Sequence, residues 1–124
     1  MKKTFACIVI FVLLSSAINA QLTDTKWRNF MNIPDSYETI MHFKKDTAIL
    51  TLLADGSIVE TMSYSVNRDT LRLTKISGLS PCNDNAGLYR IQLKDDKLTI
   101  APLSDDCNER ANAFNPEPWT REKI

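Results

Sequence analysis

The chain of 124 residues contains a single histidine and only three cysteines and three glycines. His42 therefore lacks the companions that a zinc centre or a Ser-His-Asp triad requires, and no serine lies in a nucleophile-elbow motif. We expect no metal, no other cofactor and no enzymatic activity. No segment of the chain concentrates Lys and Arg, and the formal net charge is zero. Nucleic-acid binding thus has no electrostatic basis.

Long apolar runs are absent beyond the first 20 residues. Lys2 and Lys3 precede the apolar stretch Phe5–Leu14, which is too short to span a bilayer, and the small residues of Ser15–Ala20 follow it. This order is typical of a cleaved secretory signal peptide. We expect a signal peptide at 1–20, a single domain at 21–124 without a membrane span, and export to the periplasm or the extracellular space.

Removal of the signal peptide also removes Cys7 and leaves two cysteines, Cys82 and Cys107. An even number of cysteines in an oxidising compartment indicates a disulfide. Two cysteines and one distant histidine are too few ligands for a structural zinc ion. We therefore predict a Cys82–Cys107 disulfide, which stabilises the fold by about 3.5 kcal/mol in the chain-entropy treatment.

Short segments of alternating polarity dominate the rest of the chain. Lys26–Ile33 has the helical spacing of Trp27, Phe30 and Met31, but Pro34 ends it cleanly, and we prefer a strand. An Asp-Gly pair at Asp55 and Gly56 predicts a hairpin. The expected strands are Lys26–Ile33, Tyr37–Lys45, Thr47–Leu53, Ser57–Val66, Thr70–Ile76, Leu88–Lys94, Lys97–Leu103 and a brief Trp119–Arg121.

Seven or eight short strands with tight turns predict an all-β antiparallel up-and-down meander. Strands that are consecutive in the sequence then pair with each other in the sheet. Closing the sheet into a barrel leaves no exposed edge strand. Ser104–Phe114 is expected to be a short helical or irregular segment. Pro116 and Pro118 exclude a long helix there.

The inward faces of these strands supply the candidate ligand-binding residues, which are apolar groups with adaptable shapes or polar tips: Met41, Phe43, Met62, Tyr64 and Tyr89. Methionines suit irregular pockets. A fully packed interior is the other interpretation, because side chains can fill a barrel of eight short strands. Regular alternation puts Glu60 on the inward face beside Met62. A bulge after the Asp-Gly turn would turn Glu60 outward, and we expect that outcome.

The early Trp27, the meander and the C-terminal tail resemble small exported bacterial lipocalin-like proteins of the calycin type. The tail motifs are G-x-Y-R, L-T-I, D-x-C-x-x-R and P-W-T-R, carried by Gly87, Tyr89, Arg90, Leu98, Thr99, Ile100, Asp105, Cys107, Arg110, Pro118, Trp119, Thr120 and Arg121. The resemblance implies an up-and-down barrel. It further implies that Trp27 packs under Arg110 or Arg121 as a cation–π contact that closes the barrel. Thr25 stands where the family pattern has glycine.

The resemblance favours an exported binding protein with a small apolar or amphipathic ligand inside the barrel. The alternative is a protein-interaction or inhibitor domain with a fully packed barrel, acting through its loops. Leu79–Pro81 or Phe114–Trp119 would then form the exposed apolar patch that such a role requires. The sequence identifies neither a ligand nor a protein partner.

Overall fold

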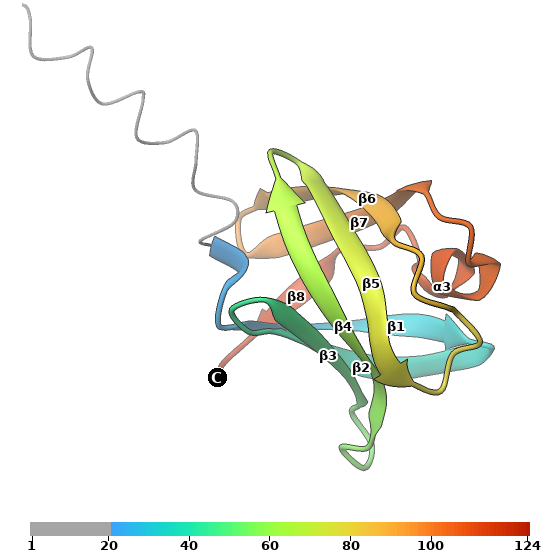
Figure 1. Ribbon diagram of the computed structural model, residues 1–124. Helices are drawn as coiled ribbons and strands as arrows, with labels where there is room; N and C mark the ends of the chain where they lie inside the picture. The colour runs from blue at the N-terminus through green and yellow to red at the C-terminus, as the bar shows by residue number, and fades with distance from the viewer. Residues whose placement is uncertain (1–20) are drawn as a thin grey trace, which may run out of the picture.

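A computed structural model describes residues 21–124, so the predicted signal peptide and Cys7 lie outside the described residues. Eight antiparallel strands form a closed barrel (Figure 1). They are β1 (Thr25–Ile33), β2 (Asp35–Phe43), β3 (Thr47–Leu52), β4 (Ile58–Asn67), β5 (Thr70–Gly78), β6 (Gly87–Lys94), β7 (Lys97–Ser104) and β8 (Trp119–Glu122). A short helix, α3 (Asn108–Ala113), lies between β7 and β8. The predicted all-β meander, its closure and the short helical segment are confirmed.

The last strand closes the barrel. β8 pairs with β1 through Trp27 and Arg121, and with β7 through Leu98 and Trp119. Because β8 joins the first strand to the seventh, the sheet formed by residues 21–124 has no free edge strand. An edge of unpaired N–H and C=O groups would otherwise invite pairing with another chain.

The turns follow the local chemistry of the sequence. Asp95 and Asp96 in the β6–β7 turn both have positive φ, 54° and 60°, as a two-residue type I′ hairpin requires. In the β3–β4 turn, Gly56 has a φ of 73°, and the Asp55 carboxylate accepts a hydrogen bond of 3.0 Å from the Ser57 amide. These turns fix the registers of the strands that they join.

An up-and-down barrel places its turns alternately at two ends. We call the end that carries the β2–β3, β4–β5 and β6–β7 turns the closed end. The open end carries the β1–β2 and β3–β4 turns, the β5–β6 loop (79–86) and α3. Figure 1 shows α3 beside the tip of the β1–β2 hairpin, at the right of the view.

Large side chains fill the interior at the closed end. Trp27, Phe43, Leu71 and Leu98 are fully buried. The Trp27 indole N–H donates a hydrogen bond of 2.7 Å to Thr25 Oγ1, which provides the partner that a buried indole needs. Aromatic burial of this kind contributes strongly to the stability of a small barrel.

A β-bulge at the start of β4 decides which side chains face inward. Ile58 pairs with Thr51 and Glu60 pairs with Leu50, so Val59 is the extra residue. Ile58 is therefore 57% exposed, whereas Val59 and Glu60 are both buried. A bulge is present after the Asp-Gly turn, but the expectation that it turns Glu60 outward is wrong. The bulge turns Ile58 out and leaves Glu60 inside.

Candidate ligand-binding site

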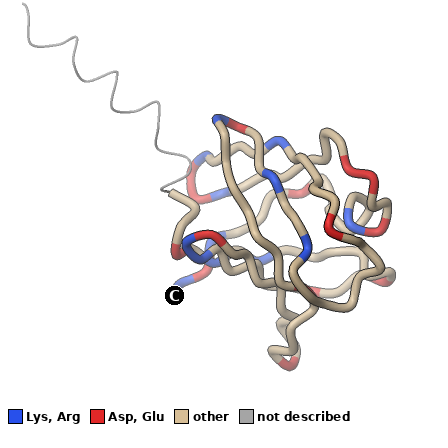
Figure 2. Tube along the Cα trace, in the orientation of Figure 1, with Lys and Arg blue, Asp and Glu red and all other residues tan. Residues whose placement is uncertain are grey.

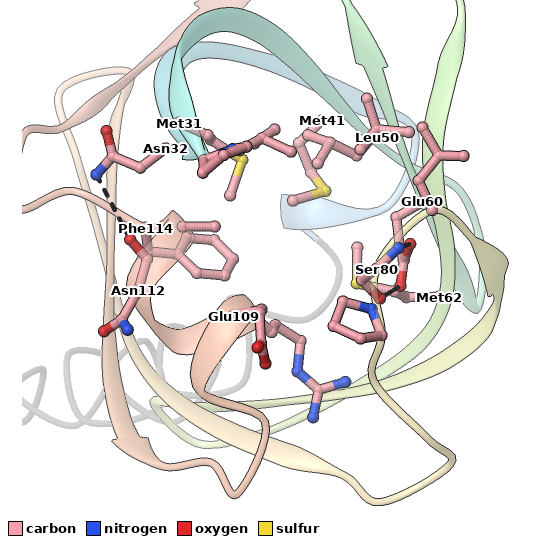
Figure 3. Close-up of a pocket in the computed structure, with 17 residues that line it drawn as sticks. Met31, Asn32, Met41, Leu50, Glu60, Met62, Ser80, Glu109, Asn112 and Phe114 are labelled. Atoms are coloured by element: carbon pink, nitrogen blue, oxygen red, sulfur yellow. Dashed lines mark hydrogen bonds between the residues drawn. The ribbon is translucent and has the colours of Figure 1, made fainter.

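The open end of the barrel contains a cavity of about 470 Å³ (Figure 3). Its walls are mainly apolar strand residues: Met31, Met41, Leu50, Val59 and Met62. Its rim is formed by the β1–β2 turn, by 79–81 of the β5–β6 loop and by α3 with Phe114. A volume of this size falls in the range of small-molecule sites in proteins.

The five predicted ligand-binding residues lie in three places. Met41 and Met62 line the cavity. Phe43 and Tyr64 form an edge-to-face pair, with ring centroids 5.0 Å apart, toward the closed end. Tyr89 is fully buried and packs on Phe114, with centroids 4.8 Å apart. Strand alternation indicates which face a residue occupies, but not how far along the barrel axis it lies.

The cavity has further lining residues that were not predicted as ligand-binding, among them Met31, Leu50 and Phe114. Met31 lies four residues after Trp27 on β1, so the alternation of that strand already placed it inward. Leu50 lies in a segment that is apolar on both faces, where alternation gives no signal. Phe114 reaches the cavity because α3 folds across the open end, and an isolated bridge joins it to Met31. No sequence pattern indicates that placement.

Glu60 is a buried polar residue of the cavity wall, with 5% of its surface exposed. Its Oε1 accepts a hydrogen bond of 3.1 Å from the Ser80 amide, and its Oε2 accepts one of 2.5 Å from the Ser80 hydroxyl. Figure 3 shows Glu60, Ser80 and Met62 on the side of the cavity opposite Phe114 and Asn112. The β5–β6 loop therefore fixes the carboxylate in position.

Gly78 leaves the space that Glu60 occupies. The two residues are partners in the β4–β5 ladder. Gly78 has a φ of 142°, a backbone conformation that residues with a side chain rarely adopt. A Cβ at this position would lie 2.1 Å from Glu60 Oε1 and 2.7 Å from Glu60 Cα. Only glycine permits this close approach of β5 to the buried carboxylate.

A second polar group at the cavity is the buried ion pair of Arg110 and Asp105. Arg110 Nε and Nη2 donate hydrogen bonds of 2.7 and 2.8 Å to the two Asp105 oxygens, and Nη2 also donates to the Asn85 carbonyl at 3.0 Å. The Tyr89 hydroxyl donates to the same carboxylate. Arg110 Nη1 is buried and has no hydrogen-bond partner among residues 21–124.

The pKa values of this group reflect burial and pairing. Burial acts to raise the pKa of Asp105, but the hydrogen bonds from Arg110, Tyr89 and the Cys107 amide outweigh it, and the pKa lies below its ordinary value. Hydrogen bonding to Asp105 raises the pKa of Arg110. Burial raises the pKa of Tyr89, so its hydroxyl remains a donor.

The two arginines proposed for barrel closure lie in different places. The Arg121 guanidinium carbon is 5.5 Å from the centroid of the Trp27 ring, within cation–π range. Arg110 lines the cavity, in the pair with Asp105. The predicted Cys82–Cys107 disulfide is confirmed, and it joins the β5–β6 loop to the residue before α3. It therefore ties together two segments of the cavity rim.

Within residues 21–124, no group of three or more His, Cys, Asp or Glu side chains is arranged to hold a metal ion. No helix in the same range is long and apolar enough to cross a membrane. Burial, with Lys26 and Lys44 nearby, lowers the pKa of His42. Figure 2 shows basic and acidic residues interspersed along the trace rather than gathered in one stripe.

Comparison of the chain with protein-family models, with curated proteins and with solved structures finds no match. The eight-stranded closed barrel is consistent with the lipocalin-like resemblance of the sequence.

Proposed function

We propose that this chain is an exported, non-catalytic binding protein of the lipocalin-like type, which holds a small and mainly apolar molecule in its open-end cavity. The observation that carries the proposal is the cavity of about 470 Å³ with walls of Met31, Met41, Met62 and Leu50. Methionine side chains are flexible and polarizable, so they adapt to ligands of irregular shape. The disulfide and the N-terminal sequence pattern support export.

The alternative role, an interaction domain acting through its loops, has less support. It assumed a fully packed barrel, whereas the open end is hollow. One observation still favours it, because Leu79 at the rim is 79% exposed. A bound ligand in contact with Leu79 would also account for that exposure.

Thermal unfolding in the presence of unbranched alkyl alcohols of increasing length tests the binding proposal. A ligand that binds only the folded state raises the midpoint temperature, and we expect the rise to grow with chain length until the chain outgrows the cavity. Met41→Trp, which places a larger side chain in the cavity, should abolish the shift. Tyr37→Trp at an exposed site is the matched control. The proposal fails if no alcohol shifts the midpoint, or if a folded Met41→Trp protein responds like the parent.

A further inference from the structure

A purely apolar ligand gives no role to Glu60. A buried carboxylate is costly to keep ionised unless a cation lies beside it. Within residues 21–124, no Lys or Arg nitrogen lies within 4.0 Å of a Glu60 carboxylate oxygen. Among the residues that the structure describes, only Ser80 donates hydrogen bonds to the Glu60 carboxylate. The carboxylate thus retains acceptor capacity at the cavity wall.

Two basic side chains, those of Lys75 and Arg110, approach the surroundings of Glu60 and bind other groups there. Lys75 donates its ammonium hydrogen bond to the Ser80 carbonyl at 2.5 Å. The Arg110 guanidinium is held on two sides by the Asp105 carboxylate, at 2.7 and 2.8 Å, so Asp105 balances its charge. Within residues 21–124, neither residue forms an ion pair with the Glu60 carboxylate.

The ionisable residues of the cavity lining are Glu60, Glu109 and Arg110. With Arg110 balanced by Asp105, two carboxylates remain without a matching cation in the lining. A cavity with this charge balance favours a positively charged ligand group and disfavours a carboxylate or a phosphate. The Coulombic preference is strengthened by the burial of Glu60, because water screens a buried charge poorly.

We propose that the ligand is an amphipathic amine, whose ammonium group pairs with Glu60 while its apolar body lies against Met31, Met41 and Met62. This inference rests on the proposed binding function. Glu60 is already buried in the folded protein. An ammonium group that binds beside it therefore gains the Coulombic attraction without a further free-energy cost for desolvating the carboxylate.

Three probes with one apolar chain and different head groups test the inference: octylamine, octanol and octanoate. Their dissociation constants are measured by calorimetry at pH 7, where an alkylamine is protonated, as a lysine side chain is. We expect octylamine to bind at least roughly tenfold more tightly than octanol, the ratio typical of one charge-assisted hydrogen bond, and octanoate to bind most weakly. Glu60→Gln should remove the preference for octylamine and leave octanol binding unchanged. Glu117→Gln, at an exposed site outside the cavity lining, is the matched control and should keep the preference.

The outcomes separate this inference from the binding function. If octanol binds and octylamine has no advantage, or if folded Glu60→Gln retains the advantage, the cavity still binds ligands but the amine inference is overturned. Tighter binding of octanoate, weakened by Arg110→Lys, would overturn it in favour of an anionic ligand at Arg110. If none of the three probes binds, the binding function itself fails.

Discussion

The two ends of the barrel are built from the same eight strands but differ in what fills them. At the closed end Trp27 is fully buried, and Phe43 packs edge to face on Tyr64. The Trp27 indole N–H and the Tyr64 hydroxyl both donate hydrogen bonds within the protein. At the open end methionines and Leu50 surround a cavity, and buried charged groups sit in its wall. The closed end is packed in a way that favours stability, and the open end holds the cavity in which we propose that a ligand binds.

The connections at the two ends differ in the same way. Tight turns join the strands at the closed end, whereas the β5–β6 loop and the segment with α3 extend across the open end. The disulfide links these two longer connections. Loops that carry binding residues need such support, because they have fewer backbone hydrogen bonds of their own than strands do.

The largest expected difference between the two ends is in the cost of removing a leucine side chain. Leu71→Ala at the closed end should lower the free energy of unfolding by about 4 kcal/mol, and Leu50→Ala at the cavity by about 2 kcal/mol. Leu50 borders an existing cavity, so its truncation removes fewer packing contacts. Urea unfolding of both variants measures the difference. Equal costs would show that the open end is packed as tightly as the closed end.

Loss of the disulfide should affect the open end first. Cys82→Ser with Cys107→Ser should lower the free energy of unfolding by about 3.5 kcal/mol, because the unfolded chain regains the freedom of the loop between the cysteines. Hydrogen exchange should quicken most in 79–86 and in α3. Buried strand amides near the closed end, such as those of Tyr64 and Leu71, should exchange only through global unfolding. Faster local exchange at these two amides would contradict the separation of the two ends.

The smallest expected effect is a pH dependence at the open end. The pKa of Asp105 is lower in the folded state than in the unfolded chain, so its ionised form stabilises the fold above the ordinary aspartate pKa of about 4. That contribution is lost as the pH falls through the folded pKa. The midpoint temperature should therefore fall more steeply on acidification in the parent than in Asp105→Asn. Exposed Asp106→Asn is the matched control, and identical profiles for all three proteins would refute a role for Asp105.

Sequence patterns were sufficient for the elements and not for the site. Period-two alternation and turn residues such as Asp55 and Gly56 are local properties, and they predicted the strands and the meander. The number of cysteines left after signal cleavage predicted the disulfide. Met41 and Met62 were placed correctly on inward faces, but so were Phe43 and Tyr64, which lie toward the other end. The distance along the barrel axis depends on strand stagger, and stagger is set jointly by all eight strands.

Glu60 shows the same limit at a single residue. Its sequence context allowed a bulge, but the extra residue could be assigned only once the pairing with Leu50 and with Gly78 was known. The sequence by itself determined a closed meander of short strands, since alternation and turn chemistry act over a few residues. Only the tertiary structure decided that the open end is hollow and that Glu60 and Arg110 lie in its wall, because strands and loops distant in the chain had to meet to enclose that space.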